Sequence, residues 1–206
     1  MKMRAGILIS GRGSNMQALI LAAERTDYLA EIALVISNRA DAAGLAVARR
    51  HGIATQVIPG RDFGTDRAAH EAAIDTALRE AGCEVVCLAG YMRLLTPFLV
   101  QRWAGRMLNI HPSLLPAYPG LDTHARALAA GAKIHGCTVH LVTETVDSGP
   151  ILAQAAVPVL PDDTGQTLAD RVLAQEHRIY PAALTRFAGG DALPADEGIS
   201  LVNPCV

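Results

Sequence analysis

Short apolar runs alternate with segments of helical periodicity along the first 110 residues of the chain. Apolar runs too short for helices predict strands at Ala5–Ser10, Ile32–Ser37, Ala54–Ile58, Val85–Ala89 and Arg106–Ile110. The segments between them predict helices at Asn15–Arg25, at Ala42–His51, from a cap at Thr65 or Asp66 to about Ala81, and from Pro97 to about Trp103. Nearly continuous apolar strands separated by helices are typical of an α/β fold. We therefore expect a Rossmann-like, mainly parallel central sheet with helices on both faces.

The pattern changes after residue 110, where the strands are expected to be mixed in direction. Pro112–Pro119 contains too many prolines for a helix or a central strand, which predicts a shaped loop. After this loop we expect a helix over Asp122–Gly131, capped by Asp122 or Thr123. Two strands follow, at Cys137–Val142 and Ile151–Val159, with a loop at Thr143–Gly149 between them. The last expected element is a long helix from Thr164 to about Phe187, interrupted or kinked near Pro181. We expect residues 1–190 to form a single domain. Residues 191–206 form a C-terminal tail, for which a short hairpin is one expectation.

Composition indicates a globular chain without a nucleic-acid partner. Half of the 206 residues are hydrophobic and 18% are charged, which is typical of a folded domain. The net charge of −2 provides no basic surface for DNA or RNA, and 4% aromatic residues are too few for a base-stacking platform. The N-terminal stretch MKMRAGILIS has too short an apolar run for a signal peptide or a membrane span, so no membrane partner is expected.

The four cysteines Cys83, Cys87, Cys137 and Cys205 lack the spacing of metal ligands. A zinc site requires closer Cys or His pairs, so no metal is expected. Cys83 and Cys87 lie at or inside an apolar strand and are interpreted as core thiols. Reduced thiols predict a cytoplasmic location.

A glycine-rich segment, Gly11-Arg12-Gly13-Ser14-Asn15, follows the first strand and opens a helix. Glycines allow the backbone to approach an anion closely, and a helix N-terminus offers N–H donors and positive potential. An ordinary strand–helix turn explains the segment equally well. Met16 replaces the last glycine of the dinucleotide fingerprint, which disfavours an NAD-dependent oxidoreductase and favours a single phosphate monoester. A non-catalytic module that binds a phosphorylated ligand would also explain this loop.

Asn109 and His111 are the most informative pair in the chain. They flank Ile110, and positions i and i+2 of a strand project from one face. Acyl transfer requires a donor at the oxygen that becomes negative and a proton carrier near the leaving nitrogen, which an amide and an imidazole supply. On the residues alone, Asn109 could instead cap the backbone at a strand end, and His111 could be a satisfied half-buried imidazole. Asp147 could be the first residue of an Asx-turn.

The runs NIHPSLLP (109–116) and DSGP (147–150) together resemble the folate-dependent formyltransferases. The run ISGRGSNMQALI (9–20) narrows the resemblance to members that formylate the amine of 5-phosphoribosylglycinamide in purine synthesis, and the resemblance extends from about Ala5 to about Phe187. It implies that 10-formyltetrahydrofolate is the co-substrate and that no metal takes part. It also implies catalytic roles, in which Asn109 binds the formyl oxygen, His111 donates a proton and Asp147 supports the protonated His111.

The resemblance further assigns residues that bind the two substrates. The phosphate is assigned to Gly13, Ser14, Asn15, Met16 and Gln17, the rest of the ribonucleotide to Glu176, and the folate to Arg67, Met92, Arg93, Leu94, Leu95 and Asn109. From their sequence context alone, Arg67 and Glu176 are also consistent with solvated helix charges, and Leu94 and Leu95 with a packed loop. His140 stays unassigned, because its alternation with apolar neighbours fits both a site residue and a core residue.

Other activities share these motifs. A methionyl-tRNA formyltransferase would need a further C-terminal domain and a basic surface, and a formyltetrahydrofolate hydrolase would carry an additional N-terminal domain. Both are therefore less favoured than transfer to a small amine. The partners expected are small molecules, and the sequence leaves open whether the chain is a monomer or a homodimer.

Overall fold

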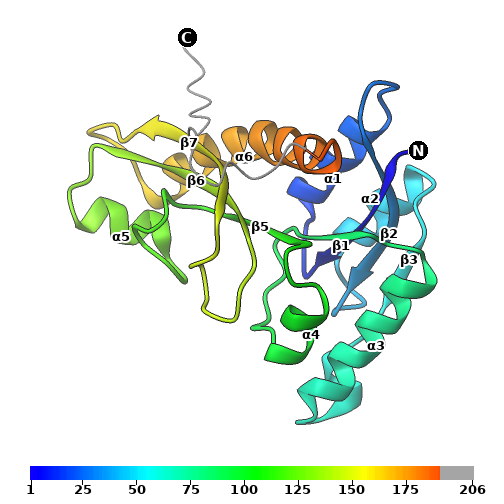
Figure 1. Ribbon diagram of the computed structural model, residues 1–206. Coiled ribbons are helices and arrows are strands. Elements are labelled where there is room, and N and C mark those ends of the chain that lie inside the picture. The colour runs from blue at the N-terminus through cyan, green and yellow to red at the C-terminus, as the bar shows by residue number, and fades with distance from the viewer. Residues whose placement is uncertain (191–206) are drawn as a thin grey trace.

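One sheet of seven strands organises the chain, in the order β3-β2-β1-β4-β5-β6-β7 (Figure 1). The computed structural model describes residues 1–190, so the hairpin expected within 191–206 lies outside the described residues. The strands are β1 Met3–Ile9, β2 Ala30–Ser37, β3 Thr55–Val57, β4 Val85–Leu88, β5 Met107–His111, β6 Ile134–Leu141 and β7 Ile151–Pro158. Strands β1 to β5 pair in parallel, whereas β6 and β7 are antiparallel to their neighbours. The predicted mainly parallel sheet with mixed strands in the second half is confirmed.

The helices lie where the pattern predicts them, with ends shifted by a few residues. They are α1 Ser14–Ala23, α2 Ala43–Arg50, α3 Arg67–Glu80, α4 Pro97–Arg102, α5 Thr123–Ala129 and α6 Gly165–Ala188. A 3₁₀ turn at Gly60–Phe63 was not predicted. Asp66 caps α3 as expected, because its side chain accepts the Ala69 N–H, and Thr164 caps α6 in the same way through the Thr167 N–H.

Two local predictions hold only in part. Asp122 is the N-cap residue of α5, one of the two caps predicted, but its side chain makes no capping bond, since its backbone is left-handed with a φ of 56°. The long helix was expected to be interrupted or kinked near Pro181, and it is not interrupted, because α6 is one helix of 24 residues that includes this proline. Proline removes one helical hydrogen bond. Burial compensates for this loss: Pro181 is buried, and its carbonyl accepts the hydroxyl of Tyr28.

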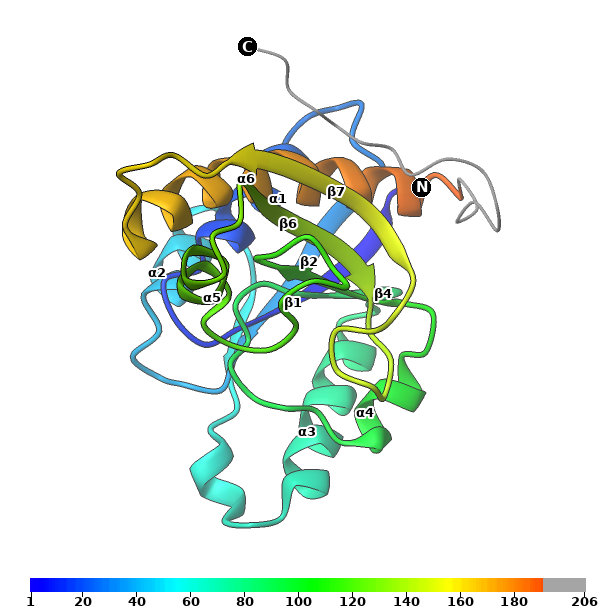
Figure 2. The same cartoon turned by 90° about the vertical axis from the view of Figure 1, so that its left-hand side faces the viewer.

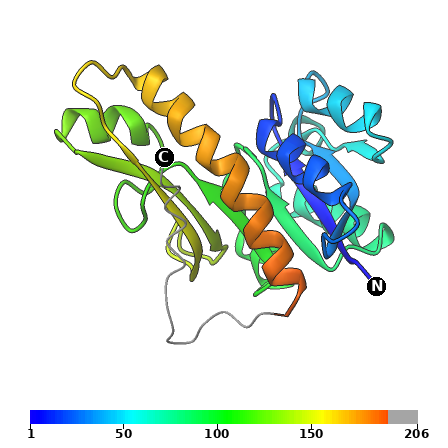
Figure 3. The ribbon, with the colours of Figure 1, turned by 90° about the horizontal axis from the view of Figure 1, so that it is seen from above.

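Helices cover both faces of the sheet, as Figures 1 and 2 show. Ile7 and Ile9 pack with α1, α2 and α6 in one hydrophobic core, whereas Leu8 packs with α3 and α4 in the other. This alternation follows from the two-residue period of a strand that is buried on both sides. Seen from above, α6 crosses between the N-terminal and C-terminal halves of the chain (Figure 3). It therefore packs against both the parallel part and the antiparallel part of the sheet.

The carboxyl ends of the parallel strands form the edge on which a ligand site is expected. The chain winds from β1 through β2 to β3 on one side and then returns to β4 and β5 on the other, so the winding direction reverses between β1 and β4. Open α/β sheets bind ligands at such a reversal. Ser10 connects the loops here, because its N–H donates to Gly90 O at 3.1 Å and its hydroxyl donates to Asn38 Oδ1 at 2.6 Å. The same hydroxyl accepts the Met92 N–H at 2.8 Å.

Candidate active site

Asn109 and His111 lie at the carboxyl end of β5 and project from the same face of the sheet. Leu108 and Ile110 point the other way into the core beneath α6. Across the antiparallel pair with β6, Asn109 lies opposite His140 and His111 lies opposite Thr138. Residues directly opposite each other in a ladder share a face. The spacing argument from the sequence therefore places the two side chains correctly.

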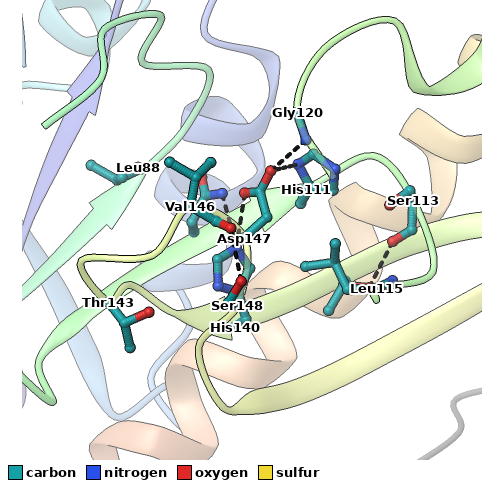
Figure 4. A network of polar contacts seen from close by, with 12 residues as sticks. Leu88, His111, Ser113, Leu115, Gly120, His140, Thr143, Val146, Asp147 and Ser148 are labelled. Carbon is teal, nitrogen blue, oxygen red and sulfur yellow. Dashed lines mark hydrogen bonds and ion pairs between the residues drawn. The ribbon is translucent and has the colours of Figure 1, made fainter. Parts of the chain in front are cut away.

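Asp147 reaches this pair from the loop between β6 and β7, 36 residues further along the chain than His111. Its Oδ2 lies 3.3 Å from Nδ1 of His111 and accepts the N–H of Gly120 at 2.8 Å. Its Oδ1 lies 3.7 Å from Nε2 of His140, so the carboxylate stands between two imidazoles (Figure 4). The side chain is 9% exposed, and its backbone has a left-handed φ of 52°. Asp147 thus holds the β6–β7 loop against the loop that follows β5.

His111 is buried, and both of its ring nitrogens have partners. Nδ1 faces Asp147, and the Nε2–H donates to the carbonyl of Tyr118 at 3.0 Å. Tyr118 lies in the proline-rich loop and has a left-handed φ of 54°. The Tyr118 carbonyl therefore occupies the ring nitrogen that faces away from Asp147.

His140, which the sequence left unassigned, lies next to Asn109 and Asp147. It is 2% exposed, its Nδ1–H donates to Leu141 O at 2.9 Å, and its Nε2 lies 3.1 Å from Nδ2 of Asn109. Burial lowers the pKa of His140, and the Leu141 carbonyl and Asp147 oppose this shift. The strand register that brings His140 opposite Asn109 could not be read from the sequence pattern.

The loop between β1 and α1 presents backbone donors at a helix N-terminus. Gly13 adopts a left-handed φ of 71°, and α1 has neither a side-chain cap nor an acidic residue in its first turn. The first helical bond runs from Gln17 N–H to Gly13 O at 2.9 Å, so the amides of Ser14, Asn15 and Met16 precede it and point out of the helix. The Met16 side chain is fully buried, so this residue can contribute its amide alone. The Gln17 N–H donates to the Gly13 carbonyl within the helix and is therefore not one of these outward-pointing donors.

Two of the predicted substrate residues, Asn15 and Glu176, contact each other. Asn15 Nδ2 donates to Glu176 Oε2 at 2.6 Å, and Asn15 Oδ1 is buried without a hydrogen-bond partner. Glu176 is 7% exposed, which excludes the alternative of a solvated helix charge. Burial raises the pKa of Glu176, and the bond from Asn15 lowers it in part. This buried pair joins the N-terminus of α1 to the middle of α6.

The segment after β4 combines exposed apolar side chains with arginines. Met92 is 69% exposed and Leu94 is 66% exposed, whereas Leu95 packs against the core beside α3 and α4. Arg67 donates to the carbonyl of Leu94, so the structure brings this arginine to the segment. The Arg93 guanidinium lies against Gly60, where an added Cβ would meet Nη1 at 1.7 Å. A cavity of about 570 Å³ adjoins Arg93 and is also lined by Arg39 and Arg61.

Within residues 1–190, no group of three or more His, Cys, Asp or Glu side chains is arranged to hold a metal ion. No helix in that part of the chain is long and apolar enough to cross a membrane.

Comparison with known proteins identifies the relationship. Residues 3–184 match the sequence profile of the family described as formyl transferase. The chain belongs to the formyl transferase family. This formyl transferase is 46% identical over 184 residues to "Phosphoribosylglycinamide formyltransferase" of Escherichia coli strain K12, covering 89% of the chain and 86% of that protein. The two runs that carried the resemblance, 109–116 and 147–150, are those that meet in the site.

Solved structures and longer relatives agree with this assignment. The crystal structure of phosphoribosylglycinamide formyltransferase from Brucella melitensis is 58% identical, with a TM-score of 0.88, and the match covers 92% of this chain and 97% of that one. The "Trifunctional purine biosynthetic protein adenosine-3" of Bos taurus is 48% identical over 197 residues, which are 96% of this formyl transferase. The chain spans about a fifth of the length of that bovine relative.

Proposed function

We propose that this formyl transferase moves the formyl group of 10-formyltetrahydrofolate to the amine of 5-phosphoribosylglycinamide, a step of de novo purine synthesis. The observation that carries the proposal is the meeting of Asn109, His111 and Asp147 at the end of β5, with Asp147 Oδ2 at 3.3 Å from His111 Nδ1. Family membership and the names of the relatives support the same substrates.

The reaction forms one nitrogen–carbon bond and breaks another. The neutral amine attacks the formyl carbon, negative charge develops on the formyl oxygen, and the bond to the folate nitrogen then breaks. One proton passes in total from the attacking nitrogen to the leaving nitrogen. Asn109 and protonated His111 stabilise the developing oxyanion, because donors held in a buried site act more strongly than they do in water. No covalent enzyme intermediate is needed.

Asp147 orients His111 and stabilises its positive charge. Its Oδ2 contacts both Nδ1 of His111 and the Gly120 N–H, which fixes the carboxylate on the side of the ring away from Nε2. Nε2 donates to the Tyr118 carbonyl, and the proposed mechanism requires this carbonyl to give way when both substrates bind. Nε2–H is then the group that delivers the proton to the leaving nitrogen.

The N-terminus of α1 binds the phosphate of the ribonucleotide. The outward-pointing amides of Ser14, Asn15 and Met16, together with the positive end of the helix dipole, suit a phosphate dianion. The Glu176 carboxylate, which accepts the Asn15 amide through Oε2, offers an acceptor for a hydroxyl group of the sugar.

The folate binds along the segment after β4. Met92 and Leu94 are exposed apolar side chains that can cover a flat ring, while Arg67 and Arg93 lie beside them with charges that suit the carboxylates of a folate. The same proposal treats residues 1–190 as one formyltransferase domain, since all seven strands belong to one sheet. The free thiols of Cys83, Cys87 and Cys137 suit the cytoplasmic location that the proposal assigns.

An alternative within the same family is hydrolysis of the formyl donor. Mixing the protein with 10-formyltetrahydrofolate, with and without 5-phosphoribosylglycinamide, separates the two reactions. Transfer predicts deformylation that depends on the amine and yields one formylated ribonucleotide per folate released. Deformylation at the same rate without the amine would instead establish hydrolysis, and no deformylation in either mixture would favour a non-catalytic binding module.

A further inference from the structure

His140 has no part in the reaction described above, yet it is one of the most buried polar side chains near the site. It lies on β6 directly opposite Asn109, and its two ring nitrogens make different contacts. Nδ1 is 2.9 Å from the carbonyl oxygen of Leu141, and Nε2 is 3.1 Å from Nδ2 of Asn109. These contacts determine both the tautomer of His140 and the orientation of the Asn109 amide.

A carbonyl oxygen can only accept, so Nδ1 of His140 must carry a hydrogen. If the ring is neutral, Nε2 then has no hydrogen and accepts. The atom of Asn109 that faces it must therefore be the amide nitrogen rather than the amide oxygen. If the ring were charged, Nε2 would donate, and the Asn109 amide would turn its oxygen towards His140.

Two observations favour the neutral ring. His140 is buried, and its contact with Asp147 Oδ1 at 3.7 Å is too long for a hydrogen bond. The other carboxylate oxygen of Asp147, Oδ2, contacts His111 and Gly120. Burial also lowers the pKa of His140, in agreement with the geometry.

We propose that His140 is a positioning residue, whose unprotonated Nε2 fixes the amide of Asn109 with its nitrogen inward and its second N–H directed at the formyl oxygen. The inference rests on the proposed function, because it assigns His140 a role through the oxyanion donor of that reaction. If the Asn109 amide were free to rotate by about 180°, it would present its oxygen to the developing negative charge for part of the time. Repulsion there would oppose the transition state while leaving the binding of either substrate largely unchanged.

A double-mutant cycle tests this connection. His140→Leu removes the acceptor at similar volume, and His140→Gln keeps an acceptor near the end of the side chain. His140→Leu is expected to lower kcat about tenfold, the scale of one hydrogen bond, with the KM for the ribonucleotide changed less than about twofold. His140→Gln should recover most of the loss. In an Asn109→Ala background, His140→Leu should lower kcat less than about twofold.

Equal losses from His140→Leu in the wild-type and Asn109→Ala backgrounds would overturn the proposal, because His140 would then act independently of Asn109. The tautomer is measured separately on the wild-type protein by ¹⁵N NMR of the imidazoles, which requires neither catalysis nor a variant that folds. A protonated Nε2 of His140 at neutral pH would also overturn the proposal. Wild-type protein that transfers no formyl group at all would refute the proposed function instead.

Discussion

Replacement of Gly13 by alanine tests whether the loop between β1 and α1 is a dedicated phosphate site. Gly13 has a φ of 71°, and a Cβ at this position would lie 3.1 Å from both the Cα of Gly44 and the Cε of Met16. The left-handed backbone costs an alanine about 1–2 kcal/mol. The contact atom of Gly44 is a backbone Cα, which cannot rotate away as a side chain can. The loop must therefore also shift by a few tenths of an ångström. That shift moves the amides that are proposed to bind the phosphate.

The structure offers a matched control in Gly52. Its φ is 72°, and no atom lies within 4 Å of an added Cβ, so Gly52→Ala has the same backbone strain without the contact. Both variants are expected to lose about 1–2 kcal/mol of unfolding free energy. Only Gly13→Ala should weaken the phosphate site. Loss of one hydrogen bond to a charged group costs about 1.5–3 kcal/mol, which corresponds to a rise of roughly ten- to a hundredfold in the KM for the ribonucleotide.

The assay is steady-state formyl transfer with each substrate varied at a saturating concentration of the other. The KM for the folate co-substrate should stay within about twofold of wild type in both variants, since its proposed site lies along the segment after β4. An unchanged KM for the ribonucleotide in folded Gly13→Ala would refute the assignment of the phosphate to this loop. A parallel rise in the KM for both substrates would do the same.

Three further changes test the stability of the surrounding structure. Tyr180→Phe removes a hydroxyl that lies 3.1 Å from the carbonyl oxygens of both Leu88 and Leu108, and should lower the unfolding free energy in urea by about 1 kcal/mol; an unchanged midpoint would contradict this. Thr96→Val removes a hydroxyl donor from the buried carboxylate of Glu71 and should lower the unfolding free energy by about 1–3 kcal/mol, whereas Thr96→Ser should lower it much less; equal losses in the two variants would contradict this. Burial raises the pKa of Glu176 above 4.5, so its stabilising contribution is fully present below pH 4.5 and is lost as the pH rises through the raised value. Glu176→Gln should remove this decline, and identical pH profiles of unfolding free energy for the two proteins would exclude it.

The fold could be predicted from the sequence because the strands are buried on both faces. Continuous apolar runs such as Val85–Leu88 produce the clearest pattern, and the intervening helices restrict the sheet to mainly parallel pairing. The continuity of α6 through Pro181 could not be predicted. Proline disfavours the interior of a helix on local grounds. The tertiary contacts that offset this effect involve residues far away in the sequence, such as Tyr28.

The arrangement of the candidate site could be predicted where its residues are close in sequence, and could not be predicted where they are far apart. The spacing of Asn109 and His111 places them on one face directly. The position of His140 opposite Asn109 depends on the register between β5 and β6, and the Tyr118 carbonyl reaches His111 through the shape of a proline-rich loop. Neither of these features leaves a periodic signal. The partnership of Asp147 with His111 came from the family resemblance, because 36 residues separate them.

The central claim is that Asn109 and His111 act together on one developing oxyanion, and the most direct test is the kcat of formyl transfer in the two single alanine variants and the double variant. Each single change should lower kcat by about 10²- to 10³-fold, the scale for loss of one oxyanion donor. The double variant should lose less than the product of the two single effects, because the residues act as a unit. Binding of the ribonucleotide, measured by calorimetry, should persist in all three proteins. A folded Asn109→Ala/His111→Ala protein that transfers the formyl group at a near-normal rate would contradict the account.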